Sequence, residues 1–360
     1  MKKAFLSLTV LAFIASGCGL FGGKGTGHHG ELTGVTDRLE WDQYQPMGMV
    51  FVTPGSFHMG QNDQDVPYSQ IAHNRQITIS GYFMDEFEIT NNQYRQFVYG
   101  PSANEANAFQ QNGALDTIDP ILQEIIIPDT TVWIRDFAYA YNEPLMENYF
   151  WHPAFDNYPV VGVNWYAAQE FCKWRTLHLN QYREEKELPA MPRFRLPTEA
   201  EWEYGARGGY EHKIFPWESP YLRNSKGCFL ANFKPGRGDY IADNFEYTSP
   251  VGAYFPNEYG LWDMPGNVAE WCEDDFEETG YRYAHDLNPV YYDRDRFPDE
   301  VRIPGGGKIR KVIRGGSWKD IGYFLSCGTR SFEYADTAKS FIGFRTAVTV
   351  IGRSGAAGNF

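Results

Sequence analysis

Two pairs of amide and carboxyl residues are of the types that bind a hard cation. Asn232 is followed by Asp243, and Asn267 is followed by Glu270. Their side chains carry the oxygen ligands that Ca²⁺ prefers, and loop carbonyls commonly complete such a shell. The neighbouring carbonyls expected to do so belong to Phe233, Phe245 and Val268. The same residue types also suit an Asx turn or a helix cap, so the residues alone leave both roles open.

The thiols form no recognisable catalytic or metal-binding pattern. Besides Cys18, the cysteines are Cys172, Cys228, Cys272 and Cys327, with no CxxC pair among them. That spacing indicates neither a zinc ribbon nor a thioredoxin-type site. We expect free, mostly buried thiols, and two disulfides are the alternative.

Other catalytic motifs are also missing from the sequence. His28 and His29 are adjacent, but the remaining histidines are scattered, without the HExxH or His-x-His spacing of a metal site. There is no GxSxG nucleophile motif, P-loop or dinucleotide-binding fingerprint. Carboxylate pairs are frequent, but in a chain with 46 acidic residues they are typical of a solvated face.

Local patterns predict the elements that must position these residues. Residues 49–52 and 56–60 indicate two strands around a Thr-Pro-Gly turn, and 77–87 alternates like a third strand. Thr90, Asn164 and Thr198 are placed to cap three helices. After about residue 210 the chain consists of short apolar segments broken by Gly, Pro, Asn and Asp, which predicts packed irregular loops with short strands.

Composition indicates a globular, loop-rich protein. The chain has 360 residues, of which 42% are hydrophobic and 17% aromatic, enough for a sizeable core. Its net charge of −14 leaves no basic stripe to neutralise phosphates. We therefore exclude nucleic acid as a partner.

The first residues predict export and lipidation. A short positive start precedes an apolar run at 4–14, which is too short to span a bilayer and reads as a signal peptide at 1–17. Ala15-Ser16-Gly17-Cys18 is similar to the lipobox of bacterial lipoproteins, so Cys18 is the expected lipidation site. Residues 18–48 are then a glycine-rich tether and a lead-in. The alternative is an ordinary signal peptide in which Cys18 has no role.

An ordered set of motifs resembles the sulfatase-modifying-factor family, whose best-known members are the formylglycine-generating enzymes. The matching stretches are 49–60, 84–91, 159–165, 195–203, 231–233, 250–252, 257–271, 314–318 and 343–345. The resemblance implies one α+β domain at 49–350, with sparse regular structure similar to C-type lectin-like domains. It also implies an insertion at about 99–157, a tail at 351–360, and calcium at the two amide and carboxyl pairs.

The resemblance also implies what the catalytic centre should contain. Formylglycine-generating enzymes are copper-dependent oxidases in which two cysteines, five residues apart after an Arg-Gly-Gly-Ser-Trp segment, hold the metal. Here Asp320 and Leu325 stand at those two positions. Cys327 is the only thiol nearby, and one thiolate makes a poor copper(I) site. We therefore expect no copper, no catalytic residue and a degenerate active site, which makes the chain a pseudoenzyme.

Within the family, the lipobox and the stretches 30–35 and 55–65 are similar to the gliding-motility lipoproteins of the GldK (PorK) type. The resemblance implies a non-catalytic, lipid-anchored protein on the periplasmic side of the outer membrane. It would form a homo-oligomeric ring of the type IX secretion machinery with a GldN-like (PorN-like) periplasmic partner and other components of that system. The alternatives are the sister GldJ type and an active formylglycine-generating-type oxidase.

Overall fold

The computed structural model describes residues 41–61, 71–100, 125–139, 144–236, 239, 241–242, 244–280, 284–294, 304 and 308–354. The chain divides into two compact units, and the larger one spans Gln43–Ile351. In the smaller unit, β1 (Trp41–Asp42) pairs antiparallel with β12 (Arg353–Ser354). The predicted signal peptide, Cys18 and most of the tether lie outside the described residues.

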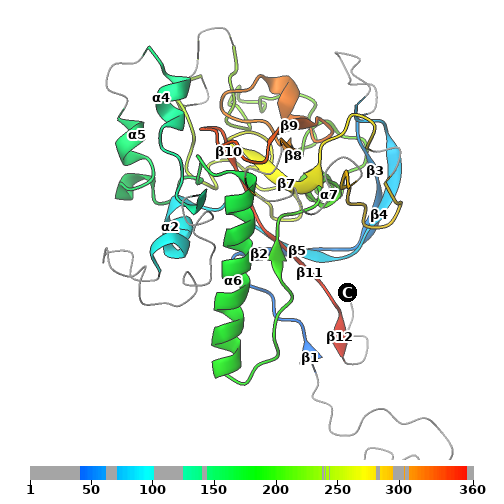
Figure 1. The fold of residues 1–360 in the computed structure, drawn as a ribbon. Coiled ribbons are helices and arrows are strands. Elements are labelled where there is room, and N and C mark those ends of the chain that lie inside the picture. Colours follow the sequence, from blue (N-terminus) through cyan, green and yellow to red (C-terminus); the bar gives the residue numbers. More distant parts are fainter. Residues whose placement is uncertain are drawn as a thin grey trace, which may run out of the picture. The chain divides into compact units, whose positions relative to one another are not determined.

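Two four-stranded sheets form the frame of the larger unit (Figure 1). The first has the order β2-β5-β11-β6 and is antiparallel throughout. The second has the order β10-β7-β8-β9, in which only β10 and β7 run parallel. The bounds of the first sheet are β2 (Met49–Val52), β5 (Tyr82–Asp85), β6 (Phe194–Arg195) and β11 (Ala347–Thr349). Those of the second are β7 (Ala269–Asp275), β8 (Arg310–Arg314), β9 (Ser331–Tyr334) and β10 (Ile342–Gly343).

A separate hairpin pairs β3 (Gly55–Met59) with β4 (Arg75–Ile79). The prediction of a single strand at 77–87 is wrong, because Ser80 and Gly81 interrupt the strand and separate β4 from β5. At Gly81 a Cβ would lie 3.1 Å from the Phe51 ring, so a side chain there would crowd the first sheet. The strands at 49–52 and 56–60 are confirmed to within one residue.

The three predicted helix caps are confirmed. Thr90 begins α2 (Asn91–Tyr99) and Thr198 begins α7 (Glu199–Arg207), each with a complete capping box. Asn164 begins α6 (Trp165–Glu185), where its side chain accepts from the Ala167 N–H at 2.9 Å. Among the described residues, none of the helices combines the length and apolar character needed to cross a bilayer. This mixture of few helices and short strands confirms the α+β class.

The described part of the expected insertion is partly core. Figure 1 shows α4 (Val132–Asp136) and α5 (Leu145–Asn148) beside α2, away from the β3–β4 hairpin. A short 3₁₀ turn, η2 (Pro153–Phe155), follows them. Trp133 and Tyr149 are buried, and the Trp133 ring stacks on Trp318 with centroids 6.2 Å apart. These two aromatic residues therefore seal the segment onto its own domain.

Candidate functional site

The candidate site is the segment 315–328 after β8, in which Asp320 and Leu325 stand at the positions where the resemblance implies two copper-binding cysteines. Asp320 lies in a tight turn: the Ser317 hydroxyl donates to its carboxylate at 2.6 Å, and the Asp320 N–H donates to the Ser317 carbonyl at 2.9 Å. Burial raises the pKa of the Asp320 carboxyl, while its hydrogen bonds to Ser317 oppose that shift. Asp320 is thus held by its neighbour and stabilises a turn.

Leu325 and Cys327 are both part of the interior. Leu325 ends the 3₁₀ turn η5 (Gly322–Leu325) and packs, 1% exposed, in an apolar cluster with Phe215 and Phe233. Cys327 is 2% exposed, and burial raises the pKa of its thiol to about 12. Because the thiolate is the metal ligand and the nucleophile, a thiol protonated at neutral pH is a poor candidate for either role.

The remaining described cysteines agree with the expectation of free thiols. Cys172 and Cys272 are buried and Cys228 is exposed, and each carries a free thiol. Burial raises the pKa of Cys172 and Cys272 as well. These two thiols therefore act as small apolar groups in the core.

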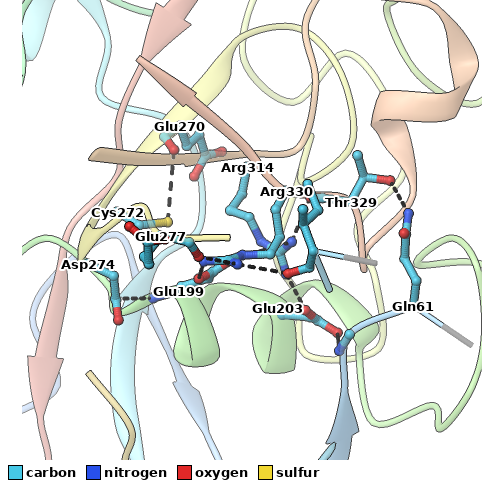
Figure 2. Close-up of polar contacts among 12 residues, drawn as sticks. Gln61, Glu199, Glu203, Glu270, Cys272, Asp274, Glu277, Arg314, Thr329 and Arg330 are labelled. Carbon is cyan, nitrogen blue, oxygen red and sulfur yellow. Dashed lines mark hydrogen bonds and ion pairs between the residues drawn. The ribbon is translucent and has the colours of Figure 1, made fainter. Parts of the chain in front are cut away.

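A buried network of acidic and basic side chains joins both ends of this segment to α7 (Figure 2). Glu199 on α7 accepts two hydrogen bonds from Arg330, at 2.6 and 2.9 Å. Glu203, one turn later, pairs with Arg314 at the end of β8. Arg314 also donates to the Thr329 carbonyl at 2.6 Å. All four charged side chains are at most 4% exposed, so the network fixes the position of the segment on α7.

The same network reaches the hairpin. The other oxygen of Glu203 accepts from the Gly60 N–H at 2.8 Å and from Arg207 at 2.6 Å. Gln61 then donates to the Thr329 hydroxyl at 3.0 Å. The acidic groups thus serve as acceptors for buried arginines and backbone N–H groups, an arrangement that stabilises the loops.

Two of the proposed calcium ligands do come together. The Asn232 side-chain amide donates to the Tyr247 carbonyl at 2.8 Å, and the main-chain carbonyl of Asn232 accepts from the Asn267 N–H at 2.8 Å. The Asn267 side-chain oxygen accepts from the Ser249 N–H at 2.8 Å, and its amide donates to Glu88 at 3.1 Å. Asn267 has φ +57°, a conformation that Asn tolerates better than most residues.

Glu270, the other member of the pair with Asn267, is bound by a buried arginine. It lies in β7, fully buried, and its two oxygens accept from Arg345 at 2.7 Å each, with a further bond from the Trp202 N–H at 2.8 Å. These three donors occupy most of the acceptor sites of the carboxylate, so a calcium ion bound through Glu270 would share it with Arg345 and Trp202. Val268 is buried in the core beside it.

The other calcium pair is only partly described. Asp243 lies outside the described residues, Phe233 packs with Leu325, and the Phe245 ring contacts Tyr254. Calcium binding at either pair therefore stays a prediction.

Two further acidic groups, Glu88 and Asp263, are buried in this region, and the sequence did not indicate them. Burial raises the pKa of Glu88, and the nearby charges of Asp263 and Glu270 raise it further. One Glu88 oxygen is buried without a hydrogen-bond partner among the described residues. Burial also raises the pKa of Asp263, to about 6. Glu88 belongs to the family motif at 84–91, but nothing in that motif indicates that Glu88 is buried, because its burial depends on contacts with distant segments.

Similarity to known proteins extends over most of the chain, including the residues described above. The family model described as "Sulfatase-modifying factor enzyme 1-like domain" matches residues 37–350. Mouse (Mus musculus) formylglycine-generating enzyme is 30% identical over 314 residues, 83% of this chain and 74% of the relative. Mouse inactive C-alpha-formylglycine-generating enzyme 2 is 29% identical over 328 residues, 86% and 88% of the two chains. The chain is thus similar both to a formylglycine-generating enzyme and to a relative named as inactive.

The solved structures support the fold. PvdO from Pseudomonas aeruginosa has a TM-score of 0.56 at 20% identity, and the match covers 84% of this chain and 94% of that one. Treponema denticola variable protein 1 has a TM-score of 0.52 at 25% identity, with 84% and 95% covered. The expected fold is therefore confirmed.

Proposed function

Because this chain belongs to the sulfatase-modifying factor enzyme 1-like domain family, we propose that it is a non-catalytic member that uses the fold as a binding scaffold. Its expected lipid anchor at Cys18 would hold it at the periplasmic side of the outer membrane. There it would form a ring of the type IX secretion and gliding machinery with a GldN-like partner. The sister GldJ type is the nearest alternative assignment.

The observation that carries the proposal is the set of residues at the positions of the expected copper site. Asp320 is held by Ser317, Leu325 fills an apolar cluster, and Cys327 is a buried thiol whose pKa is raised to about 12. Copper-dependent cysteine oxidation needs soft thiolate ligands, and none is offered at this position. A scaffold with rigid, buried ion pairs can persist without chemistry if its surface binds a partner.

The segment 125–157 supplies the candidate partner surface. Its buried aromatic residues hold it in place, whereas Ile134 is 45% and Trp151 is 46% exposed. Ile127 and Tyr139 are exposed in the same segment. Large apolar and aromatic side chains of this kind dominate the energetics of protein interfaces. We therefore place contact with the GldN-like partner here.

The proposal is tested by affinity capture from detergent-solubilised membranes, with the partners identified. Ile134→Ala combined with Trp151→Ala should reduce recovery of the periplasmic partner at least tenfold. Leu177→Ala, which removes an exposed apolar side chain on α6, is the matched control and should leave capture unchanged. All these variants should unfold within about 1 kcal/mol of the parent, as surface changes usually do.

Two outcomes would contradict the proposal. Full capture by the double variant would move the contact away from 125–157. Recovery of only a cysteine-containing substrate of the sulfatase type would favour the alternative, an active formylglycine-generating-type oxidase.

A further inference from the structure

Two histidines and a glutamate that are distant in sequence meet beside the β3–β4 hairpin. His58 lies on β3, and Glu211 and His212 lie in the loop after α7. One ligand atom from each lies within 4.8 Å of the other two. The His58 and His212 rings are 4.7 Å apart between centroids. The separation in sequence explains why histidine spacing alone indicated no metal site.

The buried Arg207 positions both halves of this cluster. Its guanidinium donates to the Gly60 carbonyl at 2.8 Å, two residues after His58, and to the Lys213 carbonyl at 2.9 Å, one residue after His212. Glu203 holds the guanidinium from the other side. The two segments are therefore fixed to one rigid group, which is what a preorganised site requires.

The geometry within the cluster is too open for hydrogen bonding and suits an ion between the groups. His58 Nδ1 is 3.8 Å from Glu211 Oε2, and His212 Nε2 is 3.9 Å from the same oxygen. Both distances exceed a normal N–H···O hydrogen bond. In tetrahedral zinc sites, ligand bonds of roughly 2.0–2.1 Å place neighbouring ligand atoms about 3.3 Å apart. The three ligand atoms lie within 4.8 Å of one another, so side-chain rotations must bring them closer together when an ion binds.

His58 Nδ1 is itself an unused ligand. It is buried and has no hydrogen-bond partner among the described residues. Glu211 and His212, in contrast, are 55% and 50% exposed, so an ion and a water molecule have access. His212 has φ +59°, a conformation unusual for a residue other than glycine, which turns this loop residue toward the hairpin.

We propose that His58, Glu211 and His212 form a binding site for a borderline divalent transition-metal ion of the Zn²⁺ class. Two imidazoles and one carboxylate are typical zinc ligands, and a water molecule would complete a four-coordinate shell. The bound ion would tie the loop at 208–214 to the hairpin and so stabilise the folded state by binding to it preferentially. The site does not depend on the proposed scaffold function.

The test is zinc binding to the full chain by equilibrium dialysis with metal analysis. Three features elsewhere in the sequence offer zinc ligands of their own, namely Cys18, His28-His29 and the exposed thiol of Cys228. The parent protein for the test therefore carries Cys18→Ala, His28→Gln, His29→Gln and Cys228→Ser. It should bind one Zn²⁺ per chain, and millimolar Ca²⁺ should not displace it, because imidazole is a poor ligand for calcium.

Three variants of that parent test the ligands. His58→Gln, Glu211→Gln and His212→Gln should each weaken zinc binding at least tenfold, whereas His285→Gln, which alters an exposed histidine elsewhere, should not. The thermal midpoint of the parent should rise with zinc, and the rise should vanish in the His212→Gln variant. Equal midpoints of the metal-free proteins would show that the variants fold. Absence of stoichiometric binding, or binding unchanged in all three variants, would overturn the proposal.

Discussion

Replacing Glu203 by Gln should remove the anion at the centre of the buried charge network. Glu203 is fully buried, and its oxygens accept from the Gly60 N–H, from Arg207 and from Arg314. A glutamine keeps one acceptor but turns an amide donor toward one arginine and leaves a positive charge without its partner. Glu199 lies 3.7 Å from Arg314 and compensates only in part. Breaking a buried pair in this way typically costs about 3–5 kcal/mol.

The assay is urea unfolding of the mature chain carrying Cys18→Ala, followed by circular dichroism. Glu278→Gln is the matched control, because Glu278 pairs with Arg310 at 2.9 Å but is 48% exposed. Exposed pairs contribute about 1 kcal/mol or less, so this control should unfold close to the parent. A loss below about 1 kcal/mol for Glu203→Gln would refute the reasoning, because it would mean that water reaches these charges.

Three further predictions concern the anchor, calcium and pH. Cys18→Ala expressed in the native host should leave the membrane fraction or accumulate as precursor, which fractionation and blotting would detect; normal processing with retention in the membrane would contradict lipidation. Millimolar calcium should raise the thermal midpoint and a chelator should lower it, and both effects should be smaller after Asp243→Ala. Glu270→Gln should destabilise the fold with or without calcium, because the Glu270 oxygens bind Arg345. A thermal midpoint that does not respond to calcium would contradict calcium binding at the two pairs. Burial, followed by the charge of Glu199, raises the pKa of Asp274 from 3.8 to about 7, so the folded state binds the proton more tightly. The free energy of unfolding of the parent, relative to that of Asp274→Asn, should therefore fall as pH rises from about 4 to about 7 and level off above that range. Urea unfolding of the two proteins at several pH values measures this difference, and a difference that does not change with pH would exclude the pKa shift.

The elements that could be predicted from the sequence are those whose ends are determined by residues close together in the chain. Thr90, Asn164 and Thr198 cap their helices through hydrogen bonds to residues three positions away, so a short window contains the whole signal. The short strands around the turn at 53–55 are likewise defined by adjacent residues. The α+β class came from the resemblance to the family, because no local pattern determines how distant elements pack.

The strands that escaped prediction carry charges that are neutralised across the fold. Asp275 on β7 and Lys311 on β8 are each at most 2% exposed and pair with each other at 2.8 Å. In sequence such residues indicate a solvated surface, and only long-range pairing makes their burial favourable. The meeting of His58 with His212 was hidden for the same reason. The pairing of Glu270 with Arg345, 75 residues away, likewise lies outside any short stretch of sequence.

The absence of oxidase chemistry is the central claim, and one measurement tests it most directly. Purified protein supplied with copper(I) and dioxygen should leave the cysteine of a sulfatase-motif peptide unchanged in mass spectrometry, while mouse formylglycine-generating enzyme converts it under the same conditions. The reason is that Asp320 and Leu325 occupy the segment without offering a thiolate, and Cys327 is buried and protonated at neutral pH. Formation of formylglycine by this chain, abolished by Cys327→Ser, would contradict the account and reveal a rearranged active site.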